Sequence, residues 1–78
     1  SRTAIARERL AQVVQAFETL PEHYRQVITL SRIAGLSHSQ VADRMGRSED
    51  SVRNLLSRAL AKLAGLLTPA PKSEEREA

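Results

Sequence analysis

Apolar residues recur every three or four positions along the first half of the chain, which is the spacing of one face of an α-helix. One stripe lies within residues 4–19. Another lies on a second helix, which is predicted to begin at Pro21. Proline suits the first position of a helix because its missing N–H would be unpaired there anyway. Gly35 ends the second stripe, and Leu36 is expected to fold back as the hydrophobic contact of the helix C-cap. The pattern predicts two helices, with apolar faces formed by Ala6, Leu10, Val13, Val14 and Phe17 and by Tyr24, Val27, Ile28, Leu30 and Ile33.

The start and the end of a short third helix are marked by polar residues and a glycine. Ser37 is followed three residues later by Gln40, a capping-box pattern that predicts a helix beginning at His38. Gly46 follows Met45 and ends the helix, because glycine adopts the left-handed backbone conformation without the penalty of a Cβ.

A fourth helix is predicted over residues 49–67, with Ser48 as its N-cap. Glu49 and Asp50 lie in its first turn, where negative charge offsets the positive end of the helix dipole. Its broad apolar face consists of Val52, Leu55, Leu56, Ala59, Leu60, Leu63, Leu66 and Leu67.

The third and fourth helices together have the spacing of a helix-turn-helix motif, over about residues 37–60. Ala42 stands four residues before Gly46, and its small side chain lets the two helices cross closely. Val52 stands six residues after Gly46 and fixes the second helix onto the first. The sequence therefore predicts an all-α fold, a small four-helix domain with a C-terminal helix-turn-helix.

Polar residues gather on the side of the fourth helix that faces away from its apolar residues. They recur at intervals that place them on one side at about 100° per residue. Arginine can donate two hydrogen bonds to guanine, and asparagine can pair with adenine, when such a helix enters a major groove. A solvated helix surface is the alternative interpretation. With the turn pattern, we favour DNA base contacts by Arg53, Asn54, Ser57 and Arg58.

Other polar residues near the turn are better placed for phosphates than for bases. Ser48 and Ser51 lie at a helix N-terminus, where backbone N–H groups favour an anion, although they also serve as caps. We expect phosphate contacts from these two residues and from Arg47 and Lys62. Carboxylates repel phosphates, so Glu49 and Asp50 are expected either to tilt away from DNA or to weaken binding.

Length and charge agree with a single DNA-binding domain. The chain has 78 residues and a net charge of +3. Residues 1–67 hold ten Arg or Lys against six Asp or Glu, a net charge of +4, so the predicted domain is the more basic part. Residues 68–78 contain two prolines, alternating charges and almost no apolar residues, and are predicted to be a disordered C-terminal tail.

The composition disfavours several other function classes. There is no cysteine, and neither His23 nor His38 has a second ligand at metal spacing, so no metal or cofactor is expected. No catalytic constellation is visible, and enzyme activity is not expected. No membrane span or signal peptide is visible either, and a cytoplasmic location is expected. The chain begins with Ser1 rather than Met, which is compatible with a fragment of a longer protein.

The order of these elements resembles region 4 of the bacterial sigma-70 family, particularly the extracytoplasmic-function (ECF) group of sigma factors. The resemblance covers about residues 9–67. It implies a fold of the winged-helix-like, sigma region 4 DNA-binding type, with no wing. The residues that carry it are Leu20-Pro21-Glu22-His23-Tyr24-Arg25, Gly35-Leu36-Ser37, Val41-Ala42, Met45-Gly46-Arg47-Ser48, Val52-Arg53, Ser57-Arg58-Ala59 and Lys62-Leu63.

The resemblance implies a role in transcription initiation. Such domains place their last helix in the major groove of the promoter −35 element and contact the β-flap of the RNA polymerase core. They are also common surfaces for anti-sigma factors. By this resemblance, phosphate contacts from the start of the third helix fall on Ser37, Ser39 and Gln40.

Two alternatives to this role stay open, and the first comes from residues that depart from the pattern of the family. Glu49 and Asp50 replace a small or apolar residue and a glycine, and Leu55 and Leu60 replace basic residues, so the last helix is less basic than usual. A helical protein-interaction module that does not bind DNA is therefore one alternative. The other is the helix-turn-helix output domain of LuxR-type regulators, which shares the four-helix order and a similar Gly-Leu-Ser and Ser-x-x-x-Val pattern. The Leu-Pro opening of the second helix differs from the signature of that domain.

Overall fold

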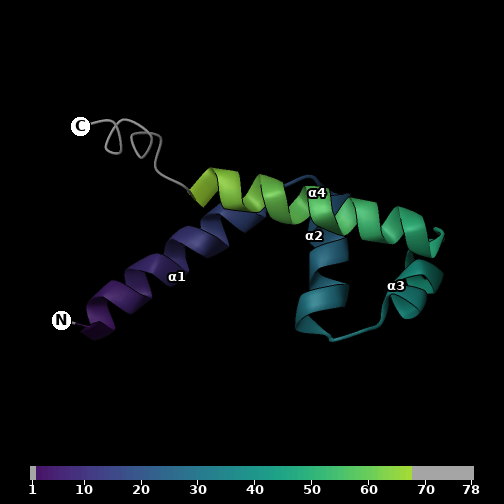
Figure 1. Ribbon diagram of the computed structural model, residues 1–78. Coiled ribbons are helices and arrows are strands. Elements are labelled where there is room, and N and C mark those ends of the chain that lie inside the picture. Colours follow the sequence, from purple (N-terminus) through teal and green to yellow (C-terminus); the bar gives the residue numbers. More distant parts are fainter. Residues whose placement is uncertain (1, 68–78) are drawn as a thin grey trace, which may run out of the picture.

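The computed structural model describes residues 2–67, and these residues form an all-α fold with no strand among them. Four α-helices follow one another along the chain, as predicted, and a short π-helical segment extends the second (Figure 1). The disorder predicted for residues 68–78 lies outside the described residues. The elements are α1 (Arg2–Glu18), α2 (Glu22–Ile28), η1 (Thr29–Ile33), α3 (His38–Met45) and α4 (Glu49–Leu67).

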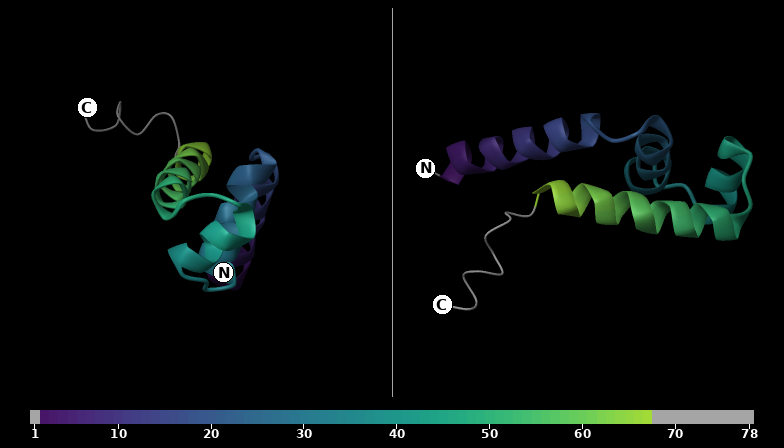
Figure 2. Two further views of the ribbon diagram at one scale, coloured as in Figure 1. Left: turned by 90° about the vertical axis from the view of Figure 1, so that its right-hand side faces the viewer. Right: turned by 90° about the horizontal axis from the view of Figure 1, so that it is seen from above.

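The core lies where α2, α3 and α4 meet. Val27, Val41 and Val52, one from each of these helices, are fully buried. Helix α4 packs against both α2 and α3 and also touches α1. Figures 1 and 2 show that α4 crosses α2 at a steep angle, with α3 beside the N-terminal end of α4. The remaining buried residues are Leu20, Ile28, Ala42, Leu55, Leu56 and Ala59.

The second helix differs from its prediction at both ends. Pro21 has extended backbone angles (φ −55°, ψ 152°), so it is the N-cap and the helix begins at Glu22. Its carbonyl oxygen still accepts the N–H groups of Tyr24 and Arg25, at 3.0 and 3.1 Å. At the other end, the N–H of Ala34 donates to the carbonyl of Thr29 at 2.8 Å, a five-residue bond that closes the π-helical turn.

The cap after this π-helical turn is the one that the sequence predicts. Gly35 has a left-handed backbone (φ 76°), which ends the helix. The N–H of Leu36 then donates to the carbonyl of Leu30 at 3.0 Å. The side chain of Leu36 folds back and packs against the core.

The apolar stripe of α1 forms a helix as predicted, but the domain buries none of its residues completely. Leu10 is 64% exposed, and Val13 and Val14 are also exposed, whereas Phe17 packs against the core. Figure 1 shows the reason, because α1 diverges from α4 towards its own N-terminal end. Only the last turns of α1 therefore reach the rest of the domain.

The turn between α3 and α4 has the geometry that the motif predicts. Gly46 adopts left-handed angles (φ 66°, ψ 39°), and its N–H donates to the carbonyl of Ala42. The N–H of Arg47 donates to the same carbonyl at 3.0 Å. Ala42 is buried between the helices, so the close crossing and the left-handed glycine occur together.

Two glycine substitutions are expected to change stability in opposite directions. A Cβ at Gly46 or at Gly65 would meet no atom within 4 Å, so backbone conformation alone decides the effect. Gly46→Ala places alanine in the left-handed region and should lower the free energy of unfolding by about 1 kcal/mol. Gly65→Ala lies inside α4 and should raise it by about 0.5 kcal/mol. Urea unfolding followed by circular dichroism measures both, and a loss of stability of equal size in the two variants would contradict this account.

Candidate nucleic-acid interface

The start of α4 is fixed by two hydrogen bonds that Ser48 accepts. Its hydroxyl oxygen accepts the N–H of Ser51 at 3.1 Å, and its carbonyl accepts the N–H of Val52 at 3.0 Å. These bonds confirm Ser48 as the cap that the sequence predicts. They also fix the direction of the first turn of α4, and the predicted base-contacting residues lie directly after this turn in the sequence.

The start of α3 carries the predicted capping box. The hydroxyl of Ser37 accepts the N–H of Gln40 at 3.2 Å, and the side-chain oxygen of Gln40 accepts the N–H of Ser37 at 2.9 Å. The side-chain amide of Gln40 keeps its two N–H donors outside this box. Ser37, Ser39 and Gln40 are all exposed, and phosphate contacts by them stay a prediction.

The predicted base-contacting residues share the exposed side of α4. Arg53, Asn54, Ser57 and Arg58 are exposed, whereas Val52, Leu55, Leu56 and Ala59, which alternate with them, are buried in the core. Leu55, an unusual residue for the family position, is therefore part of the core of this domain. The polar side of the first three turns of α4 is the side left free by packing.

Asp50 lies on this same exposed side and pairs with Arg53. Its carboxylate oxygen Oδ1 accepts a hydrogen bond from Nη1 of Arg53 at 2.8 Å. At about 100° per residue, Asp50 lies between Arg53 and Asn54 around the helix axis, and Glu49 lies about 40° beyond Arg53 on the other side. Asp50 thus lies within the polar stripe formed by Arg53, Asn54, Ser57 and Arg58, and it holds Arg53 by an ion pair. The sequence analysis did not predict this pair.

The residues predicted to contact phosphates lie around this stripe rather than in one cluster. Nη1 of Arg47 donates to the hydroxyl of Ser51 at 3.2 Å, which holds Arg47 beside the first turn of α4. Lys62 is exposed one turn after Arg58 and extends the basic side of the helix towards its C-terminal end. Contacts of these residues with DNA stay predictions.

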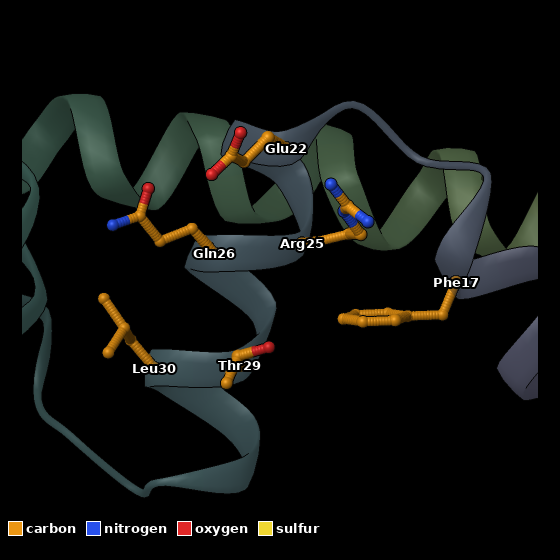
Figure 3. Close-up of a pocket in the computed structure, with 6 residues that line it drawn as sticks. All are labelled: Phe17, Glu22, Arg25, Gln26, Thr29 and Leu30. Carbon is orange, nitrogen blue, oxygen red and sulfur yellow. The ribbon is translucent and has the colours of Figure 1, made fainter.

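A pocket that the sequence did not predict lies on α2, away from the exposed stripe of α4. It has a volume of ≈ 360 Å³, and none of its lining residues belongs to α4. Figure 3 shows the guanidinium of Arg25 above the ring of Phe17, with Leu30 at the other end. Nε of Arg25 is buried and has no hydrogen-bond partner among the described residues. The lining residues are Phe17, Glu22, Arg25, Gln26, Thr29 and Leu30.

Within residues 2–67, no three His, Cys, Asp or Glu residues are grouped so that they could hold a metal ion. His23, one of the two histidines of the chain, instead contacts an aromatic ring, because its ring and that of Tyr24 have centroids 4.7 Å apart. No helix in this part of the chain combines the length and the apolar character that a membrane span requires.

Comparison with known proteins identifies the family of this four-helix domain. Residues 10–63 match the family described as "Sigma-70, region 4". The chain belongs to the sigma-70 region 4 family. The matched residues extend from α1 to most of α4, and this family match makes the chain a DNA-binding domain of a sigma factor.

A curated relative of this region 4 domain is the "RNA polymerase sigma factor NccH" of Alcaligenes xylosoxydans xylosoxydans, which is 36% identical over 66 residues. The match covers 85% of this chain and 36% of the relative, so the chain spans about a third of the length of that protein. No solved structure matches the chain at a significant level. The relative and the family match favour the sigma-factor interpretation over the LuxR-type alternative.

Proposed function

We propose that this domain, as part of an ECF-type sigma factor, binds the −35 element of bacterial promoters and thereby directs RNA polymerase to sites of transcription initiation. The observation that carries the proposal is the division of α4 into two sides. One side is buried against α2 and α3, and the other presents Arg53, Asn54, Ser57 and Arg58 to solvent. Only the second side is free to enter a major groove, which admits one α-helix.

Each residue of this stripe has a donor or acceptor set that suits a base edge. The guanidinium groups of Arg53 and Arg58 can each donate two hydrogen bonds to O6 and N7 of guanine. The amide of Asn54 can pair with N6 and N7 of adenine, and the hydroxyl of Ser57 can donate or accept. These functions need binding and orientation alone, so we propose no catalytic step and no cofactor.

Phosphate contacts on both sides of the groove would supply most of the affinity. We assign them to residues at the start of α3, around the turn and further along α4. Their hydroxyl, amide or cationic groups are exposed, apart from the half-buried Ser51. The residues are Ser37, Ser39, Gln40, Arg47, Ser48, Ser51 and Lys62.

The pocket on α2 suits a protein partner that binds together with DNA. Its lining belongs to α1, α2 and η1, so a segment seated there leaves the exposed side of α4 free. We propose that the β-flap of the RNA polymerase core docks on this side of the domain, in the cytoplasm where transcription takes place. The exposed apolar residues of α1 add a surface suited to an anti-sigma factor.

Alanine substitutions on α4 should separate base contacts from phosphate contacts. With a duplex selected by the 78-residue chain from a randomised pool, Arg53→Ala or Arg58→Ala should lower specific binding by about 1–3 kcal/mol. Lys62→Ala should weaken binding to selected and scrambled duplexes equally and reduce the salt slope by about 1. Fluorescence anisotropy at several salt concentrations measures these affinities.

Arg7→Ala is the matched control, because it removes the same charge from an exposed position in the N-terminal half of α1, outside the helix-turn-helix. It should leave the preference for the selected duplex unchanged. The proposal fails if the chain binds no duplex at low salt, or if Arg7→Ala reduces the preference as much as the α4 variants do.

A bulky charged side chain at the rim of the pocket should block binding of the polymerase and leave binding of DNA unchanged. Thr29 is exposed, so Thr29→Arg adds a long side chain with little effect on the core, and it should weaken binding of the labelled chain to purified core RNA polymerase roughly tenfold. Gln15→Arg adds the same group to the exposed surface of α1 as a control. Equal binding by the two variants would contradict docking at this pocket.

A further inference from the structure

We infer that Asp50 determines base specificity by holding Arg53 in the orientation that contacts a base, and by penalising duplexes that lack this base. The inference rests on the proposed function, in which the exposed side of α4 enters the major groove. It concerns a carboxylate at a position where negative charge would otherwise only weaken DNA binding.

The geometry of the pair leaves Arg53 able to contact DNA. Nη1 of Arg53 donates to Oδ1 of Asp50 at 2.8 Å, and the side chain of Arg53 is still 58% exposed. A guanidinium carries N–H donors along two edges, so a single bond to Asp50 leaves an edge free for two parallel bonds to guanine. Asp50 therefore restrains the arginine without using the donors that a base contact needs.

Restraint matters because a free arginine side chain has many rotamers. Fixing such a side chain in one rotamer on DNA costs conformational entropy. A partner three residues earlier on the same helix face removes part of this freedom before DNA arrives. The pair is exposed, so it contributes little to the stability of the free domain, and its effect is expected in the complex.

The negative charge of Asp50 supplies the second half of the mechanism. Its side chain is 88% exposed, and it would meet the field of the DNA phosphates when α4 enters the groove. While Arg53 bridges Asp50 and a guanine, the carboxylate stays paired. On a duplex whose base opposite Arg53 offers no acceptor, Arg53 can bind DNA only by turning to a phosphate. The carboxylate of Asp50 is then left unpaired near the negative charge of the phosphates.

This mechanism differs measurably from simple masking of Arg53. If Asp50 only competed with DNA for the arginine, its removal would raise affinity for every duplex and would keep or sharpen the base preference. If Asp50 positions the arginine, its removal raises affinity for unrelated duplexes and flattens the preference at one base position. That position must be the one that Arg53 itself contacts.

The test is selection from a randomised duplex pool by the 78-residue chain, followed by sequencing, with wild type and four variants. Asp50→Asn removes the charge and keeps the shape, and Arg53→Ala marks the base position that Arg53 contacts. Glu49→Gln is the matched control, because it removes the same charge one residue away, from a side chain with no hydrogen bond or ion pair to Arg53. The double variant Asp50→Asn/Arg53→Ala completes the cycle, and circular dichroism verifies that each variant is folded.

We expect Asp50→Asn to reduce the preference for the favoured base, at the position that Arg53 contacts, roughly threefold or more. The preference that a bidentate contact provides is larger than this, so a reduction of this size can be measured. Glu49→Gln should leave the preference intact, and Asp50→Asn should have no further effect on it in the Arg53→Ala background. An unchanged or sharpened preference in Asp50→Asn, or one flattened equally by Glu49→Gln, overturns the inference and leaves the proposed function standing. If wild type selects no sequence, the proposed function itself fails, and the inference with it.

Discussion

The burial of three valines, one each from α2, α3 and α4, is the constraint on which the rest of this domain depends. Val27, Val41 and Val52 are fully buried, and their contacts fix how α4 is rotated about its own axis. Once Val52 and the leucines and alanine that follow it face the core, Arg53, Asn54, Ser57 and Arg58 must face solvent. The same packing that stabilises a small aliphatic core therefore also aims the polar side chains that we propose to contact DNA.

Much of this arrangement could be predicted from the sequence because it rests on local rules. The capping box of Ser37 and Gln40, the cap at Ser48 and the left-handed Gly46 each depend on a few neighbouring residues, and the structure has all three. The two sides of α4 follow from its 3.6-residue period. The family resemblance followed from the same residues, and the match over residues 10–63 confirms it.

Other features depend on how separate helices are placed, which local patterns do not determine. The stripe of α1 has helical spacing like that of α4, yet Leu10 is largely exposed because α1 diverges from the domain. Arg25 and Phe17 line one pocket only because the end of α1 meets α2. The Asp50–Arg53 pair follows a local rule, since residues three apart are neighbours on a helix. The sequence pattern, however, points first to two other effects of Asp50, which are its interaction with the helix dipole and its repulsion of phosphates.

The central claim is that the exposed side of α4 recognises DNA sequence, and an amide NMR titration tests it most directly. The chain is titrated at low and moderate salt with a duplex carrying a purine-rich −35-like sequence and with a scrambled duplex of equal composition. The account predicts that the amide signals of Arg53, Asn54, Ser57 and Arg58 shift more with the −35-like duplex, while those of the first turns of α1 stay in place. The absence of any shift on α4 at low salt would contradict the claim.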